Sequence, residues 1–277
     1  MKLGIVGNGI VGGATLSAFA PLETLVYDVV PERSKNDLNE VLKADLIFVC
    51  LPTPQVERRY EADTSYIDTF FAKALEAPVN AASFVLRSTV PIGYTKSLAK
   101  KFSLSNLAYW PEFLTVRSAA FDARYPTRNL VGNVATKEGE LNPAAVALWD
   151  LVTSRWPTVD LYVDTSDNVE AAKLFQNAFS AVKISFFNEI NLLSEALGLN
   201  WERVLAMLLA GGWINPKHTE VPGPDGLYGF GGACLPKDLA SLVHQLIVAR
   251  CDADISISVL RRNRKDRSRA RREPNKD

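Results

Sequence analysis

The residues with the clearest chemical potential form a glycine-rich loop that leads into a cysteine. Gly229-Phe230-Gly231-Gly232-Ala233-Cys234 is followed at once by Leu235-Pro236-Lys237-Asp238, where proline, lysine and aspartate open a predicted helix. A cysteine just ahead of a helix N-terminus feels the positive end of the helix dipole, which lowers its pKa and favours the thiolate. Taken alone, the pattern favours a buried structural cysteine at Cys234, and a nucleophile is the alternative.

A second pair of chemically useful side chains lies upstream, in a stretch with helical character. Lys173 and Asn177 are four residues apart, so on a helix they project from the same face. Taken alone, this spacing equally fits a solvated helix face.

The third feature is a glycine turn close to the first residue. Gly7-Asn8-Gly9-Ile10-Val11-Gly12 follows the apolar run Leu3–Val6, and a second apolar run, Leu25–Tyr27, ends at Asp28. This is the order of strand, turn, helix, strand and acid that a dinucleotide site requires. The first glycine permits the tight turn, the second lets a pyrophosphate approach, and the third allows close helix packing.

The acid at the end of the second run predicts which dinucleotide binds. Asp28 follows Gly12 by sixteen residues and can accept hydrogen bonds from a ribose 2′-hydroxyl, whereas its carboxylate would repel a 2′-phosphate. We therefore expect NAD rather than NADP, a preference that Arg33 nearby softens slightly. A purely structural glycine turn is the alternative reading.

The elements that must position these residues follow from the apolar runs. Near-continuous apolar strands separated by helix-length segments predict an α/β fold, a Rossmann-type doubly wound parallel sheet. Ligands of such sheets bind beyond the carboxyl ends of the strands, where Thr53, Thr89 and Glu112 each follow a strand. The predicted strands are 3–6, 25–27, 44–51, 83–88, 107–110, 129–132 and 160–163.

The composition changes near residue 166. From Ser166 to Gly198 there is no proline and no internal glycine, which predicts a connecting helix of about 30 residues, followed by an all-α domain. The predicted domains are therefore 1–165, which binds NAD, and 166–262, which is helical and carries the cysteine. Residues 263–277 are basic and lack apolar periodicity, so we expect a disordered tail.

Composition excludes several classes of protein. The chain has 277 residues with 31 Lys or Arg and 31 Asp or Glu, and this balance argues against a nucleic-acid-binding or membrane-surface protein. Three widely spaced cysteines form neither a disulfide framework nor a zinc site and fit a reducing compartment, so we expect a cytoplasmic protein. No apolar run approaches the length of a membrane span, and the two histidines lack the spacing of metal ligands.

Taken together, these residues resemble the UDP-glucose/GDP-mannose dehydrogenase family. Five motifs occur in the family's order and extend from residue 1 to about residue 263. They are Gly7-Asn8-Gly9-Ile10-Val11-Gly12; Arg87-Ser88-Thr89-Val90-Pro91-Ile92-Gly93; Pro111-Glu112-Phe113-Leu114 with Tyr125-Pro126-Thr127-Arg128; Glu170-Ala171-Ala172-Lys173 and Asn177-Ala178-Phe179 with Lys183–Ile190; and the cysteine loop Gly229–Asp238.

The resemblance implies a four-electron oxidation of a nucleotide sugar, from C6 hydroxymethyl to carboxylate, with two NAD. It implies that the Cys234 thiolate forms a thiohemiacetal and then a thioester, while Lys173 and Asn177 stabilise the oxyanion. A homodimer formed through the helical domain is implied as well.

The resemblance also assigns the remaining site residues. Asp238 would position Lys173 and the hydrolytic water, Glu112 would be the base for hydrolysis, and Thr89 would hold the water. The implied cofactor-binding residues are Gly7, Gly9, Ile10, Val11, Gly12, Asp28, Arg33, Thr53, Thr89 and Lys237. The implied substrate-binding residues are Glu112, Phe113, Leu114, Lys173, Asn177 and Gly231.

Two departures from the family pattern keep other functions open. Val116 stands where the family carries a second glutamate, and the sequence lacks the family's C-terminal UDP-binding domain. A catalytically impaired NAD-binding or partner-binding protein is therefore one alternative, and GDP-mannose is an alternative substrate. A two-electron β-hydroxyacid dehydrogenase is a third, although such an enzyme needs no cysteine loop.

Overall fold

The computed structural model describes residues 1–57, 59–76, 83–135 and 139–269 and divides into two compact units. The first unit comprises residues 1–54 and 63–174, and the second comprises residues 55–62 and the chain from 175 onward. The predicted boundary at residue 165 lies at the start of a long helix, whereas the two compact units divide inside that helix, after Leu174. The difference arises because the first turns of that helix pack with the sheet domain, where Val169 joins the core.

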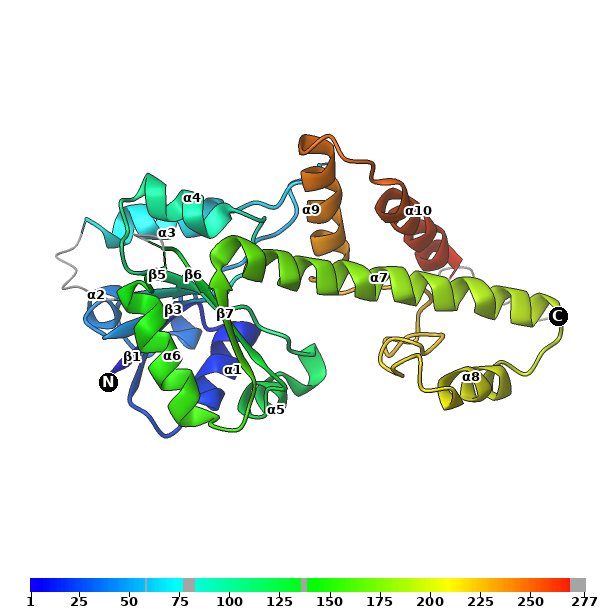
Figure 1. Cartoon of the computed structure of the whole chain (residues 1–277), viewed down its shortest axis with the longest axis horizontal. Helices are drawn as coiled ribbons and strands as arrows, with labels where there is room; N and C mark the ends of the chain where they lie inside the picture. Colours follow the sequence, from blue (N-terminus) through cyan, green and yellow to red (C-terminus); the bar gives the residue numbers. More distant parts are fainter. Residues whose placement is uncertain (58, 77–82, 136–138, 270–277) are drawn as a thin grey trace. The chain divides into compact units, whose positions relative to one another are not determined.

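The first unit is built on a seven-stranded sheet in the order β2-β1-β3-β4-β5-β6-β7 (Figure 1). The seven predicted strands are all present, within a few residues of their expected ends. The strands are β1 (Leu3–Val6), β2 (Thr24–Tyr27), β3 (Leu46–Val49), β4 (Ser83–Leu86), β5 (Leu107–Tyr109), β6 (Asn129–Asn133) and β7 (Leu161–Thr165).

Strand direction departs from the expected all-parallel sheet at one pair. β1 to β5 pair in parallel, but β6 pairs antiparallel with β5, with Tyr109 opposite Gly132, and parallel with β7. The last two strands therefore run opposite to the first five. Apolar content predicts that a strand is buried, but it carries no signal for direction, which is set by the connection between β5 and β6.

Helices cover both faces of the sheet, which explains why its central strands are mainly apolar. Residues of α2, α3 and α4 contribute to the core on one face, and residues of α1, α5 and α6 contribute to the core on the other. The helices are α1 (Ile10–Ala18), α2 (Leu38–Val41), α3 (Ser65–Ala74), α4 (Tyr94–Lys101), α5 (Ala119–Arg124) and α6 (Pro143–Arg155), with short 3₁₀ turns η1 (Pro31–Arg33) and η2 (Val116–Ser118).

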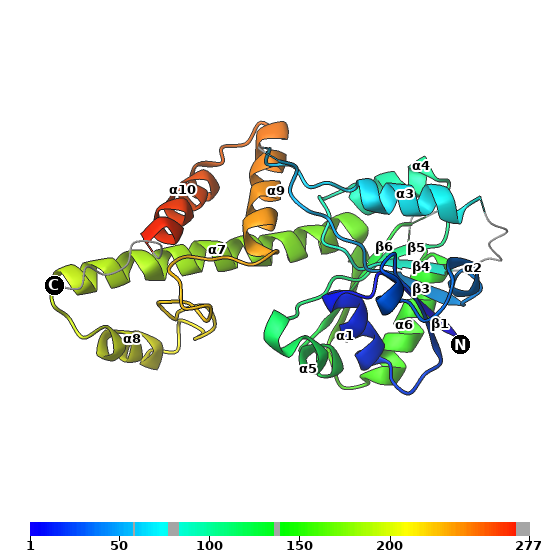
Figure 2. The same ribbon diagram turned by 180° about the vertical axis from the view of Figure 1, so that it is seen from behind.

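The second unit is helical, as predicted, and is best followed in Figure 2. Its small core joins Ala178 and Ala181 to Phe230, Leu239 and Val259. The predicted connecting helix is α7 (Ser166–Ala196), with 31 residues, and it is followed by α8 (Trp201–Ala210), α9 (Leu235–Val248) and α10 (Asp254–Arg269). Among the described residues, no helix combines the length and apolar character needed to cross a membrane.

The predicted tail is helical in its first part. The sequence suggested that order ends near residue 262, yet α10 continues to Arg269, and residues 270–277 lie outside the described residues. Asp266 is buried and pairs with Arg262, while Asn263 and Arg267 hydrogen-bond to Phe230. Because polar contacts rather than an apolar stripe hold this part of α10, the sequence offered no periodicity to reveal it.

Candidate functional site

The glycine turn has the geometry expected of a dinucleotide-binding loop. Gly7 has φ +90°, and a Cβ there would lie 2.6 Å from the Cys50 carbonyl oxygen. A Cβ at Gly12 would lie 1.9 Å from the Gly7 oxygen, so only glycine allows α1 to pack this closely. At Gly9, by contrast, a Cβ would meet nothing within 4 Å. This open approach at the start of α1 suits a pyrophosphate.

The residues beside the turn fit the same ligand. Both oxygens of the Asp28 carboxylate are held, Oδ2 by the Asn8 N–H at 2.6 Å and Oδ1 by the Val30 N–H at 2.9 Å. A carboxylate has lone pairs left for ribose hydroxyls after two such bonds. Asn8 also donates through Nδ2 to the Arg33 carbonyl oxygen at 2.7 Å. The Arg33 side chain is exposed. Ile10, next to the turn, is 55% exposed.

The ends of β3 and β4 meet at one edge of the sheet, as parallel strands must. The buried Thr53 hydroxyl donates to the Thr89 carbonyl oxygen at 2.7 Å, and Ser88 Oγ donates to the Leu51 carbonyl oxygen at 2.6 Å. The structure therefore brings together Thr53 and Thr89, two of the predicted cofactor contacts.

A buried ion pair lies beyond the end of β5. Lys173 Nζ is 3.0 Å from Glu112 Oε1, and these side chains are 3% and 9% exposed. The Leu114 N–H donates to Glu112 Oε2 at 2.7 Å, and Lys173 Nζ lies 5.2 Å from the centre of the Phe113 ring. Four of the predicted site residues thus form one cluster in the first unit.

The cluster fixes the charge state of its carboxylate. Burial alone would raise the pKa of Glu112, but the Lys173 ammonium, the Leu114 N–H and the Arg87 guanidinium together hold that pKa below its usual value. Glu112 is therefore an anion at neutral pH, which is the form a base requires.

Arg87, the first residue of the motif Arg87–Gly93, has surroundings that the sequence did not predict. Its guanidinium is buried 3.8 Å from the centre of the Trp110 ring, and burial lowers its pKa. Within the described part of the chain, its Nε and one terminal nitrogen have no hydrogen-bond acceptor. A charged residue directly after an apolar strand was the available signal.

Glu170 is a second residue with a structural role that the sequence did not predict. Its fully buried carboxylate accepts hydrogen bonds from the Gly93 N–H at 2.6 Å, the Thr95 N–H at 2.8 Å and the Thr95 hydroxyl at 2.5 Å. It thereby ties the first turn of α7 to the start of α4. Burial, which outweighs these bonds, raises the pKa of Glu170 to about 7.

The second unit carries the cysteine and its own polar cluster. Cys234 is exposed and caps the N-terminus of α9, as predicted. Asp238, buried in the first turn, accepts from Asn177 Nδ2 at 2.6 Å and from Lys237 Nζ at 2.5 Å. The resemblance implies that Asp238 positions Lys173, and this stays a prediction; within each unit, Asp238 pairs with Asn177 and Lys237, and Lys173 pairs with Glu112.

Two predicted residues have surroundings that the sequence did not anticipate. At Gly231 a Cβ would lie 2.3 Å from an Arg267 side-chain nitrogen, so a larger residue there would require the Arg267 side chain to move. Val116, in place of the expected glutamate, is 63% exposed in η2.

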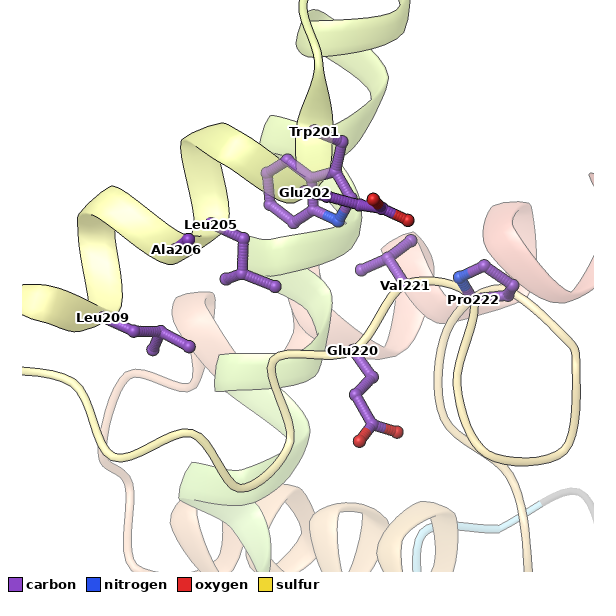
Figure 3. A pocket seen from close by; sticks show the side chains of 8 residues that line it. All are labelled: Trp201, Glu202, Leu205, Ala206, Leu209, Glu220, Val221 and Pro222. Atoms are coloured by element: carbon purple, nitrogen blue, oxygen red, sulfur yellow. The ribbon is translucent and has the colours of Figure 1, made fainter.

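A shallow pocket of about 460 Å³ lies elsewhere in the second unit and contains none of the predicted residues. Figure 3 shows Trp201, Leu205 and Leu209 of α8 on one side and Val221 and Pro222 facing them. Glu202 and Glu220 add two carboxylates to this mainly apolar lining.

Comparison with known proteins gives the site a context. Residues 22–149 match the NAD binding domain, and residues 167–265 the central domain, of the UDP-glucose/GDP-mannose dehydrogenase family. UDP-glucose 6-dehydrogenase of Campylobacter jejuni is 33% identical over 72% of this chain and 48% of its own length. UDP-glucose 6-dehydrogenase of Streptococcus pneumoniae is 28% identical over 87% of this chain and 68% of its own length.

A solved structure agrees at the level of the fold. A UDP-glucose dehydrogenase from Pyrobaculum islandicum superimposes with a TM-score of 0.79 at 25% identity, over 95% of this chain and 68% of that protein. The chain therefore spans about half to two thirds of the length of these relatives. The match to the family's NAD binding domain confirms the predicted cofactor.

Proposed function

This chain belongs to the UDP-glucose/GDP-mannose dehydrogenase family, and on that premise we propose that it oxidises the C6 hydroxymethyl group of a nucleotide sugar to a carboxylate. UDP-glucose is the first substrate to test, because curated relatives bear the name UDP-glucose 6-dehydrogenase. The observation that carries the proposal is the exposed cysteine at the start of α9, in a chain that also holds the Glu112–Lys173 and Asn177–Asp238 pairs.

The glycine turn and Asp28 would hold the cofactor. Gly9 leaves room for the pyrophosphate, the N-terminus of α1 offers N–H groups to it, and Asp28 would accept from the ribose. When bound, NAD supplies the oxidising power, since two hydrides must leave C6 to account for four electrons. The oxygen added to the carbon comes from water.

Cys234 is the proposed nucleophile. Its thiolate forms a C–S bond with the aldehyde carbon, and the carbonyl oxygen becomes an alkoxide that Lys173 and Asn177 stabilise. After oxidation at the same carbon, a thioester links the sugar to Cys234. Water then attacks the carbonyl, the C–S bond breaks, and the electron pair returns to sulfur. The thiohemiacetal formed in the first of these steps keeps the reactive aldehyde bound to Cys234 until it is oxidised.

Glu112 is the proposed base for the hydrolytic step. Its lowered pKa keeps it ionised at neutral pH, so it can accept a proton from the attacking water, which Thr89 would hold. The pairing of Asp238 with Lys237 and Asn177 supports a role in fixing the Asn177 amide at one position.

The decisive experiment counts NADH formed per UDP-glucose consumed by the purified chain. Two NADH per sugar, lost in Cys234→Ser, is the expected result. One NADH per sugar would mean that oxidation stops at the aldehyde. An intact yield of two in the serine variant would overturn the thioester route, whereas a yield of one in both proteins would favour a two-electron hydroxyacid dehydrogenase.

The same assay separates the remaining alternatives. Turnover with GDP-mannose but not UDP-glucose would identify GDP-mannose as the substrate and would leave the proposed cysteine mechanism unchanged. Binding of NADH without turnover of either sugar would identify an impaired NAD-binding or partner-binding protein. Val116, which is exposed and stands in place of the family's second glutamate, is the reason to test for this outcome.

The proposal extends to a homodimer and to the cytoplasm. Phe179, Phe186 and Leu193 follow one another at intervals of seven along α7 and are 66%, 56% and 58% exposed. Residues at this spacing lie along one helix face, and an exposed apolar stripe is typical of a helix that docks on another. A reducing compartment is inferred because the proposed thiolate must stay unoxidised.

A further inference from the structure

The backbone just ahead of the cysteine is held by side chains from two helices. The Gly229 N–H donates to Asn188 Oδ1 of α7 at 2.8 Å. Asn263 of α10 makes a reciprocal pair with Phe230, accepting from its N–H at 2.7 Å and donating through Nδ2 to its carbonyl oxygen at 2.9 Å. Arg267 Nε donates to the same oxygen at 2.9 Å. Four hydrogen bonds therefore fix two consecutive residues.

The loop glycines are matched to this contact. Gly229 has φ +71°, and a Cβ there would lie 2.4 Å from Asn263 Oδ1. At Gly231 the place of a Cβ is taken by the Arg267 guanidinium, which is itself anchored to Asp225 at 2.7 Å. The Phe230 ring is buried in the small core of the second unit. The loop backbone thus packs against the Asn263 and Arg267 side chains of α10.

The contact ends shortly before the thiol. Gly232, Ala233 and Cys234 are exposed, and α9 begins at the next residue, where the Asp238 N–H donates to the Cys234 carbonyl oxygen at 2.8 Å. Cys234 is therefore fixed between α9 on one side and the residues held by Asn263 and Arg267 on the other. Four residues of free chain can span about 13 Å, so release of Phe230 would leave the approach to the thiol poorly defined.

We propose that Asn263 and Arg267 are positioning residues for Cys234, so that α10 takes part in the oxidation without touching the substrate. This inference rests on the proposed function. Asn263 carries the larger share because its amide matches both the donor and the acceptor of Phe230, whereas Arg267 adds one bond to an oxygen already satisfied.

The first test is the yield of NADH per sugar in Asn263→Ala, with semicarbazide present to trap escaping aldehyde. Only the second half of the oxidation needs the cysteine, so the yield should fall below two. A merely structural defect would reduce the amount of active enzyme and leave the yield at two. Arg264→Ala, an exposed neighbour on α10, is the matched control and should keep a yield of two.

The second test needs no substrate. Alkylation of Cys234 by iodoacetamide is followed by mass spectrometry in a Cys251→Ser background, because Cys251 is also exposed. Loss of a fixed position at a helix N-terminus should slow the reaction about threefold in Asn263→Ala. Arg264→Ala should leave the rate unchanged.

The outcomes are separable. An unchanged alkylation rate in Asn263→Ala, or a yield that stays at two, overturns the positioning role. If the unmodified protein makes no NADH with either sugar nucleotide, the proposed function fails while the alkylation rate still decides the role of Asn263. Should Asn263→Ala not fold, Arg267→Ala removes only one of the bonds to Phe230 and is expected to move both readouts in the same direction, by less.

Discussion

Two glutamates of the first unit are both buried, but their pKa values shift in opposite directions because their neighbouring groups differ. Glu112 faces Lys173 and Arg87, and these cations hold its pKa below the usual value. Glu170 accepts hydrogen bonds from neutral N–H and O–H groups, and burial, together with the nearby Asp167 carboxylate, raises its pKa to about 7. One carboxylate therefore stays ionised for chemistry, while the other changes charge near neutral pH.

The Glu112–Lys173 pair should contribute strongly to stability. Glu112→Gln leaves a nearly buried ammonium without its anion, so the free energy of unfolding at pH 7 should fall by about 3 kcal/mol. Because the folded pKa is depressed, this contribution is present above the unfolded pKa and is lost as pH falls through the folded value. Urea unfolding of both proteins from pH 7 to pH 3 should show the difference shrinking.

An exposed ion pair provides the control for this measurement. Glu61 lies 3.8 Å from Arg59, and both side chains are well exposed, so Glu61→Gln should change stability by less than about 1 kcal/mol. Equal losses in the two glutamine variants would contradict the role given to burial.

Asp28 should set the choice of dinucleotide. Asp28→Asn keeps an acceptor beside the Asn8 N–H but removes the negative charge that would repel a 2′-phosphate. The ratio of NADPH to NADH affinity should rise by about tenfold, since one pair of like charges near the surface costs on the order of 1–4 kcal/mol. Fluorescence titration of both reduced dinucleotides measures this ratio. An unchanged ratio would mean that the 2′ position lies elsewhere.

At the scale of elements, Glu170 joins α7 to α4 and should make this junction sensitive to pH. Its folded pKa is raised, so its contribution is fully present below the unfolded pKa and is lost as pH rises through about 7. Glu170→Gln does not titrate at this position. Relative to that variant, the free energy of unfolding of the wild type should fall by about 1.4 kcal/mol per pH unit as pH rises from the unfolded pKa towards about 7. Urea unfolding at pH 5 to pH 8 gives both curves, and parallel curves would refute the prediction.

The elements differ in how well the sequence revealed them. The seven strands were predictable because each contains an apolar run, although the edge strands β2 and β7 are partly exposed and only the central strands are buried along their length. The helix α7 was predictable because proline and glycine are missing from it. The reversal of β6 was not, since pairing direction leaves no trace in an apolar run. The last turns of α10 were missed because hydrogen bonds of Asn263 and Arg267 hold them.

The candidate site also has features that the sequence predicted and features that it did not. Glycine positions and the acid after β2 follow from backbone geometry, which a local motif encodes. A local motif does not encode contacts between residues far apart in the sequence. The Lys173–Glu112 pair and the hydrogen bond from Asn177 to Asp238 therefore became visible only in the structure.

Two shortened chains would test the ordered part of α10. Removal of residues 263–277 deletes Asn263, Asp266 and Arg267, so the second unit should unfold at a lower urea concentration and amide exchange around Phe230 should rise. Removal of residues 270–277 keeps the contacts of Asn263, Asp266 and Arg267, so both readouts should stay unchanged. Identical behaviour of the two shortened chains would contradict the role given to α10.

At the scale of the whole molecule, charge is distributed unevenly along a chain that is neutral in sum. Residues 261–277 hold nine Lys or Arg against three Asp or Glu, a net charge of +6 that leaves −6 for the rest. Within α10 these cations pair with acids of the second unit, Arg267 with Asp225 and Arg269 with Glu195. Internal pairing of this kind favours a structural role for the basic residues over nucleic-acid binding.

The whole-molecule prediction concerns self-association through the stripe on α7. Phe186 is the middle member of the stripe, so Phe186→Glu would place a charge at the centre of the proposed helix contact. Light scattering should give twice the 30.5 kDa chain mass for the wild type and the single chain mass for the variant. Phe121→Glu is the control, because Phe121 of α5 is equally exposed but lies in the first unit. A wild type that stays monomeric at tens of micromolar, or equal masses for both variants, would remove the stripe as the dimer contact.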